Sequence, residues 1–234
     1  MTRTLRRQMM NYMNLKTINK DVQKLNRLLL NIKWQESSLE TLKPELTDKQ
    51  KEFIDVILLL IPEWKRLIGC QQHKTHDYTL DIHTLLVIAR IINSKEFQQL
   101  DEYYKLVLLY SALLHDIAKE ALIIDPTHPT KSSVIASEIL YRLGFDKDFV
   151  KDTTAVIKRH QYLGLHAANK LCINIPEFAN FFNKDDLIDI LAILALADIK
   201  SVKKDEEFIN QDIKNNLEHI RYNIKRYLKE HNCP

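Results

Sequence analysis

Two acidic residues, Asp116 and Asp198, stand at the ends of strongly apolar runs, and they restrict how this chain can fold. Asp116 follows the run LVLLYSALLH, and Asp198 follows ILAILALA. A carboxylate buried in such surroundings costs several kcal/mol unless its charge is neutralised. The fold must therefore bring partners to both acids. We expect a cation that the two carboxylates hold together with histidine side chains.

The shortage of turn-forming residues favours a helical fold. The chain has 234 residues but only 3 Gly and 6 Pro, which is typical of long helices joined by short links. Its length fits one hydrophobic core with extensions. We expect an all-α bundle of seven to nine helices and no strand.

Apolar periodicity and capping residues predict where these helices lie. A capping box at Thr47 and Gln50 should begin one of them, and Gly144 should end another. The expected helices cover residues 16–36, 48–61, 80–93, 101–119, 147–160, 184–202 and 206–229, together with one opened by Pro62 and one capped by Ser132 or Ser133.

We divide the chain into a basic helical extension (1–45), a core (46–202) and a C-terminal helix (203–234). The apolar stripes of the two terminal helices should dock on the core or on a second copy, which would make a homodimer. The segment from Arg3 to Lys33 contains eight Lys and Arg residues and a single acid, Asp21. This segment could bind RNA phosphates or an acidic partner, or it could be a solvated helix face.

Composition also bears on location. The three cysteines, Cys70, Cys172 and Cys233, are widely spaced and form no CxxC pair, so neither a disulfide framework nor a zinc ribbon is indicated. No apolar run approaches the roughly 20 residues of a membrane span, and the N-terminus lacks a secretory pattern. We expect a cytoplasmic protein without a membrane segment.

The candidate site is a set of histidines and acids in fixed order. An HD dipeptide alone is weak evidence, and this chain has two. His76-Asp77 lies in a polar loop where its carboxylate can be solvated, whereas His115-Asp116 adjoins an apolar helix face, so burial cost selects the second. A single histidine is more often a hydrogen-bonded structural residue than a ligand. Together, however, the residues predict a metal site formed by His83, His115, Asp116, His128, His160 and Asp198.

These residues carry a resemblance to a known family. The stretch QQHKTHDYTLDIHT, with LLYSALLHDIAKE, HPTKSSVIASEILYRLGF, VIKRH and LALADIKSV, closely resembles the HD domain superfamily of metal-dependent phosphohydrolases. The nearest branch looks like the HD domains of PII-uridylyltransferase/uridylyl-removing enzymes and of bacterial tRNA nucleotidyltransferases. The likeness covers residues 62–202. It implies an HD-type helical bundle.

The resemblance also implies a ligand set. One metal would be held by His83, His115, Asp116 and Asp198, and a second by His128 and His160, with Asp116 bridging both. Such an imidazole-rich set suits Mn, Fe, Co, Ni or Zn better than Mg. A metal-activated water would then attack the phosphate of a nucleotide, a nucleotide conjugate or a nucleic-acid end.

Basic residues near these ligands are candidates for contact with that phosphate. Lys119 follows Asp116 by three residues, so a helix would place it on the same face, where we expect it to act with Asp116 in catalysis. A lysine that merely extends to solvent is the alternative. Arg159 and Lys200, each near a ligand in sequence, are weaker candidates for substrate binding. His73, His76 and His166 are expected in loops, in solvent or at the rim of the site.

Some features depart from the nearest branch. Only some 60 residues precede the region of likeness, without a Gly-Ser and paired-aspartate signature, so we expect no nucleotidyl transfer. The link EALIIDPTHP replaces a glycine-rich one. An HD-type nuclease and a cyclic-nucleotide phosphodiesterase remain alternatives within the enzyme class. From a different class, a regulatory or scaffold module could keep the fold and the metal with little turnover.

Overall fold

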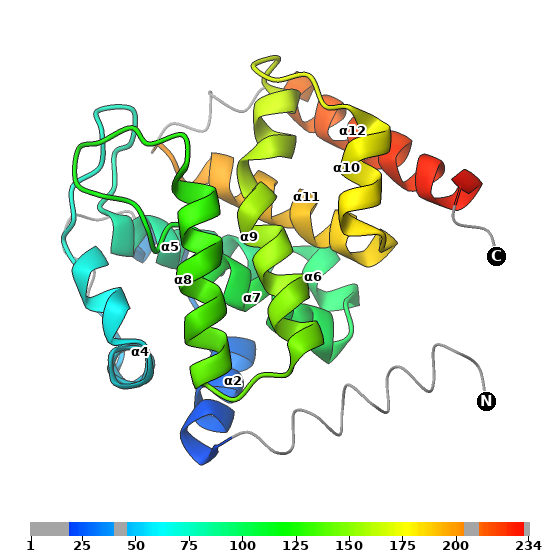
Figure 1. The fold of residues 1–234 in the computed structure, drawn as a ribbon. Helices are drawn as coiled ribbons and strands as arrows, with labels where there is room; N and C mark the ends of the chain where they lie inside the picture. Colours follow the sequence, from blue (N-terminus) through cyan, green and yellow to red (C-terminus); the bar gives the residue numbers. More distant parts are fainter. Residues whose placement is uncertain (1–18, 40–45, 204–210, 232–234) are drawn as a thin grey trace, which may run out of the picture.

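The computed structural model describes residues 19–39, 46–203 and 211–231, and over these ranges the chain is helical without a strand, so the expected all-α class is confirmed. Figure 1 shows the helices packed around α7. In chain order they are α2 (Lys20–Asn31), α3 (Glu36–Leu39), α4 (Asp48–Leu60), the 3₁₀ helix η1 (Pro62–Leu67), α5 (Leu80–Asn93), α6 (Lys95–Gln99), α7 (Glu102–Leu114), α8 (His128–Arg142), α9 (Lys147–Ala167), α10 (Ile175–Phe182), α11 (Asp185–Lys200) and α12 (Gln211–His231).

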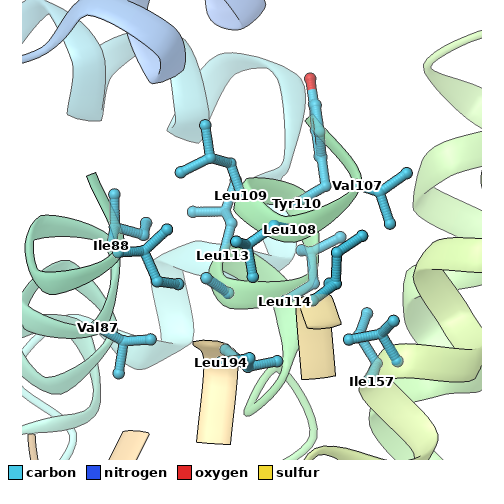
Figure 2. Packing of buried hydrophobic residues seen from close by; sticks show 14 of the residues in the cluster. Val87, Ile88, Val107, Leu108, Leu109, Tyr110, Leu113, Leu114, Ile157 and Leu194 are labelled. Atoms are coloured by element: carbon cyan, nitrogen blue, oxygen red, sulfur yellow. The ribbon is translucent and has the colours of Figure 1, made fainter. Parts of the chain in front are cut away.

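Helix α7 forms the centre of the core. From Tyr103 to Leu114 every residue except Lys105 is buried. Figure 2 shows its side chains between Val87 and Ile88 of α5 on one side and Ile157 of α9 on the other. Truncating a fully buried leucine here to alanine would cost about 2–5 kcal/mol. The doublet that follows α7 therefore lies in the buried interior.

The terminal amphipathic helices both pack on this core. In α2 the apolar stripe is buried, and the Tyr110 hydroxyl donates a hydrogen bond to Asn26 Oδ1 at 2.8 Å. In α12 the stripe of Leu217, Ile220 and Ile224 is also buried. Figure 1 shows α12 lying across α9, α10 and α11. Both stripes are thus covered within one copy of the chain. The basic residues before residue 19 lie outside the described ranges.

Several helix ends follow the sequence signals. Thr47 and Gln50 form the expected capping box at the start of α4. Gly144 follows α8 with φ +87°, the left-handed conformation in which glycine carries no Cβ penalty. The expected helices over 48–61, 80–93 and 184–202 are confirmed within two residues at each end.

Other ends differ from the predictions. Helix α8 begins at His128 rather than after Ser132 or Ser133, because Pro129 favours the first turn and the Ser132 hydroxyl accepts the Ala118 amide instead of capping. Helix α7 ends at Leu114, and a turn replaces the expected helix through Lys119, whose amide donates to the Asp116 carbonyl.

Helix α9 continues seven residues past His160, to Ala167, through a segment expected to be a loop. Gly164 lies in this part, and a Cβ there would meet Ile199 Cδ1 of α11 at 3.0 Å, so the glycine lets the two helices approach. The eleven α-helices in the described ranges exceed the seven to nine expected, because α3, α6 and α10 are too short to show a clear apolar period.

Among the described residues, no helix combines the length and apolarity that crossing a membrane requires.

Candidate metal centre

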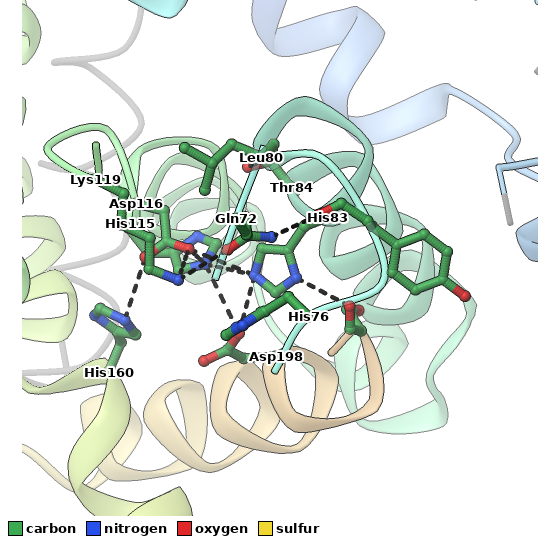
Figure 3. A network of polar contacts seen from close by, with 12 residues as sticks. Gln72, His76, Leu80, His83, Thr84, His115, Asp116, Lys119, His160 and Asp198 are labelled. Atoms are coloured by element: carbon green, nitrogen blue, oxygen red, sulfur yellow. Dashed lines mark hydrogen bonds and ion pairs between the residues drawn. The ribbon is translucent and has the colours of Figure 1, made fainter. Parts of the chain in front are cut away.

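The six predicted ligands come from four helices and from the turn that follows α7, and they meet in one cluster. His83 lies in the first turn of α5, His128 opens α8, His160 lies midway along α9, and Asp198 lies near the end of α11. His115 and Asp116 follow α7 directly. Figure 3 shows Asp116 among His83, His115, His160 and Asp198. Asp116 and the four histidines are at most 4% exposed.

The turn that carries the doublet is held by neighbouring donors. The Trp64 indole donates to the carbonyl of Leu113 at 3.3 Å, and the Arg66 guanidinium donates to the carbonyl of Ile117. Carbonyls at a helix C-terminus lack partners inside the helix, so these side chains satisfy groups that would otherwise be buried alone. Helix η1 thereby fixes the backbone that presents Asp116.

The two oxygens of Asp116 face different histidines. Oδ2 lies 3.2 Å from His115 Nε2 and 3.5 Å from His83 Nε2. Oδ1 lies 3.1 Å from His128 Nε2 and 3.8 Å from His160 Nε2. One carboxylate therefore stands between two pairs of imidazoles, and each pair has its own oxygen.

Asp198 adds a second carboxylate on the side of His83 and His115. Its Oδ1 lies 3.1 Å from His83 Nε2 and 3.8 Å from His115 Nε2, and its side chain is 18% exposed. The ligand atoms of these three residues lie within 4.8 Å of one another, and so do those of His115, Asp116 and His160. Each group could hold an ion, with His115 common to both.

Backbone carbonyls fix the orientation of all four imidazoles through Nδ1. The Nδ1 of His115, His128 and His160 lies 2.7–2.8 Å from the carbonyl three residues earlier in each case. The Nδ1 of His83 lies 3.0 Å from the distant carbonyl of Ser201. A carbonyl only accepts, so each Nδ1 carries the hydrogen, and Nε2 is the ring nitrogen that faces the cluster.

This donor set fits a divalent cation. Asp116 Oδ1 and Oδ2, His128 Nε2 and His160 Nε2 are buried and lack a well-formed hydrogen bond within the described residues, although they lie close together. Nitrogen and oxygen ligands of one transition metal, bonded at about 2.0–2.2 Å, stand roughly 3 Å apart. The separations of 3.1–3.3 Å around His83 are of that size. A cation bound between the carboxylates and the imidazole lone pairs would remove the repulsion between these groups.

When no cation is present, neighbouring protonated side chains compensate the negative charge of the carboxylates. Burial raises the pKa of Asp116, but the charges of His115 and Lys119 outweigh it and hold that pKa well below its usual value. Burial lowers the pKa of His115, yet the Asp116 carboxylate raises it above the ordinary value. Burial and the His115 charge lower the pKa of His160 to about 3. His160 is therefore neutral at pH 7, the form that binds a metal.

Lys119 joins the cluster at its open side. Its Nζ lies 2.7 Å from Asp116 Oδ2 and donates to Gln72 Oε1 at 3.3 Å. The lysine reaches Asp116 as expected, from a turn rather than from a helix. Gln72 had no signal of its own in the sequence, beyond its place in the stretch that carries the resemblance.

A cavity of about 550 Å³ opens beside the cluster, and His160, Asp198 and Lys119 lie on its lining. His76 of the second HD dipeptide also lies on this lining, with its ring centroid 5.9 Å from that of His83. Burial and the Lys119 charge lower the pKa of His76 to about 4. His76 lies outside the helices, as expected, and its neighbour Asp77 donates its amide to the carbonyl of Val202.

Two predicted substrate-binding residues do not line this cavity. Arg159 precedes His160 by one position, so the helix turns it aside, and its guanidinium lies 4.5 Å from the Tyr162 ring centroid and 4.7 Å from that of Phe181. Lys200 lines a different hollow, together with Arg90 and Glu218. Adjacency in sequence to a ligand does not place either residue at the site.

Arg90 contacts the residue that orients His83, a role that the sequence did not indicate. Its Nη1 donates to Ser201 Oγ at 3.2 Å, and its Nε donates to Glu36 Oε2 at 3.2 Å. Ser201 is the residue whose carbonyl receives His83 Nδ1. A buried arginine thus links α3 through the end of α11 to a candidate ligand on α5.

Comparison with known proteins adds no family assignment, because no protein-family model matches the sequence and no curated protein matches it either.

Proposed function

We propose that this chain is a metal-dependent phosphohydrolase of the HD type, acting on a phosphate ester of a nucleotide, nucleotide conjugate or nucleic-acid end. One observation carries the proposal: four imidazoles, each fixed through Nδ1, converge with Nε2 on the two oxygens of Asp116 and on Asp198. The order of these residues and the resemblance of the surrounding segments to HD domains support the same assignment.

The residues divide into two sets around Asp116. His83, His115 and Asp198 would hold one ion with Oδ2, while His128 and His160 would hold a second with Oδ1. Four imidazoles favour Mn, Fe, Co, Ni or Zn over Mg. When bound, such ions supply an activated water and positive charge that stabilises a phosphoryl transition state.

The remaining roles belong to the protein. Lys119 lies between the cluster and the cavity, where its ammonium group can bind a phosphate oxygen of the substrate. Gln72 holds that ammonium group in place. The carbonyls on each Nδ1 keep the imidazoles in one tautomer and one orientation. No serine or cysteine nucleophile is required, since water is the attacking group.

The decisive test is hydrolysis of p-nitrophenyl phosphate and bis-p-nitrophenyl phosphate by the full chain, with Mn²⁺, Fe²⁺, Co²⁺, Ni²⁺, Zn²⁺ or Mg²⁺ added after chelation. We expect turnover with at least one transition metal and its loss in Asp116→Asn. Asp55→Asn, on the exposed face of α4, is the matched control and should keep full activity.

Two outcomes would count against the proposal. Full activity in Asp116→Asn would show that the Asp116 carboxylate takes no part in the reaction. Stoichiometric metal without turnover on any ester would instead favour a regulatory or scaffold module that keeps the metal.

A further inference from the structure

The cavity beside the cluster is lined by two sets of charged residues. One set comprises the candidate ligands His160 and Asp198 and the ammonium group of Lys119. The other comprises Lys170, just beyond the end of α9, and Lys203, beyond the end of α11. Both of these lysines are exposed. Among the described residues that line the cavity, the single carboxylate is Asp198, which belongs to the cluster, so no further carboxylate of this lining accompanies Lys170 and Lys203.

Apolar residues make up much of the remaining lining. Gly164 of α9 and its C-cap residue Ala168 contribute to it, and so do Ala195 and Ile199 of α11. Gly164 and Ile199 are in contact at this wall, since a Cβ on the glycine would lie 3.0 Å from Ile199 Cδ1. The volume of about 550 Å³ lies within the range of small-molecule sites.

The cluster and Lys170 are set apart along α9. Ala167, the last residue of α9, lies seven residues beyond His160, which is about 10 Å along a helix axis, and Lys170 follows it. A ligand that contacts both the cluster and Lys170 therefore needs two negative groups at separate positions, as the 3′- and 5′-phosphates of a nucleotide are.

We infer that the substrate is a small nucleotide with two separated phosphate groups, of which one is hydrolysed at the cluster and the other is bound by Lys170 and Lys203. This inference rests on the function proposed above. In the reaction, the oxygen of water bonds to phosphorus and the ester P–O bond breaks. The leaving oxygen takes a proton from the water, giving an alcohol and inorganic phosphate.

A long polyanion fits the surroundings less well. Leu122, Ile123 and Ile124 are all more than half exposed, and Ile124 also lines the cavity. A continuous RNA strand leaving the site on that side would place its phosphates against apolar side chains. A compact ligand that ends at Lys170 and Lys203 avoids this contact.

The test compares three substrates with the full chain loaded with its most active metal. These are p-nitrophenyl phosphate, adenosine 5′-monophosphate and adenosine 3′,5′-bisphosphate. We expect the bisphosphate to have a KM about tenfold lower than that of the monophosphate, as two exposed lysine–phosphate contacts would give. The double variant Lys170→Gln/Lys203→Gln should lose this preference and still hydrolyse p-nitrophenyl phosphate at the original rate. Lys147→Gln/Lys151→Gln, at the exposed start of α9, is the matched control.

Calorimetric titration of the same proteins with the bisphosphate gives a readout that does not depend on turnover. Binding should weaken about tenfold in the Lys170/Lys203 variant and stay unchanged in the control. Hydrolysis of p-nitrophenyl phosphate with equal KM for the two adenosine substrates would overturn this inference and leave the proposed function intact. Preferential cleavage of a single-stranded RNA oligonucleotide would overturn it as well. No turnover of any substrate would instead count against the proposed function, and the titration would still decide the role of the two lysines.

Discussion

The Nδ1 of His83 donates to the backbone carbonyl of Ser201 at 3.0 Å, across 118 positions of the chain. This contact joins the first turn of α5 to the residue that ends α11. It fixes the tautomer of His83 and directs Nε2 toward Asp198 at 3.1 Å. The orientation of one candidate ligand therefore depends on how Ser201 is held, and Arg90 holds it.

Replacing Arg90 should weaken metal binding without removing a ligand. In Arg90→Met, Ser201 loses its guanidinium partner and His83 loses its fixed orientation, so we expect the metal Kd to rise about 10-fold or more. Competition with a chromophoric chelator measures this Kd. Arg142→Met, which removes an arginine from a surface ion pair with Glu63, is the control. An unchanged Kd in Arg90→Met would show that the link is structural only.

Metal binding should stabilise the fold. A free ion concentration 100 times the Kd adds about 2.7 kcal/mol to the free energy of unfolding, because the ion binds the folded chain and not the unfolded one. Differential scanning calorimetry with and without the ion measures the rise in Tm. Asp116→Asn keeps the side-chain shape but loses the charge, and its Tm should not respond. A response equal to that of the wild type would place the ion elsewhere.

The two oxygens of Asp116 predict two ions. His128→Gln removes the imidazole nearest Oδ1, at 3.1 Å, and leaves His83, His115 and Asp198 untouched. We expect the bound metal to fall from two equivalents to one, as measured by elemental analysis after dialysis. His166→Gln is the control, since His166 lies outside the cluster and contacts the carbonyl of Leu171. One equivalent in the wild-type chain would refute the two-ion arrangement.

A second buried acid, Asp152, predicts a stability effect away from the site. Its carboxylate is 1% exposed, accepts from Tyr103 Oη at 3.1 Å and contacts Lys184 Nζ with Oδ2 at 2.6 Å. Lys184→Met leaves this charge without its cation, which should cost about 3 kcal/mol or more in the free energy of unfolding. Urea denaturation at pH 7 measures the loss. Adding Asp152→Asn should recover part of it, and no recovery would contradict this account.

The Glu63–Arg142 pair predicts a small pH dependence. The hydrogen bonds that Glu63 accepts from Arg142 lower the Glu63 pKa more than burial raises it. A depressed carboxyl pKa stabilises the fold above the unfolded value near 4.5, and this contribution is lost as the pH falls through the folded value. The side chains are 31% and 47% exposed, so the pair is worth less than about 1 kcal/mol. The difference in unfolding free energy between wild type and Arg142→Met should be constant from pH 7 to 5 and should decrease below pH 5. An increase of this difference at low pH would contradict the prediction.

The features that the sequence predicted well are those with a strong local or energetic signal. Low glycine and proline content predicted the helical class, and Thr47 and Gly144 predicted two helix ends. Burial cost separated His115-Asp116 from His76-Asp77, and the structure does place only the former beside α7 in the cluster of candidate ligands.

The features that were missed depend on tertiary contacts. Helix α9 continues past His160 because Gly164 packs against Ile199, a contact that no local pattern reveals. Arg90 looked like an ordinary helix arginine, since its partners Glu36 and Ser201 lie 54 and 111 positions away. Arg159 was considered because it precedes His160, yet adjacent helix residues point in different directions.

The carbonyl contacts of the histidines also imply an order of assembly. His115, His128 and His160 each take their orientation from the carbonyl three residues earlier, so a single turn of chain is enough to set each ring. His83 takes its orientation only when α5 and the end of α11 have met. Three of the candidate ligands can thus be oriented by local folding, and the fourth is oriented only when these two distant parts of the core pack together. A fully assembled cluster therefore reports that folding of the core is complete.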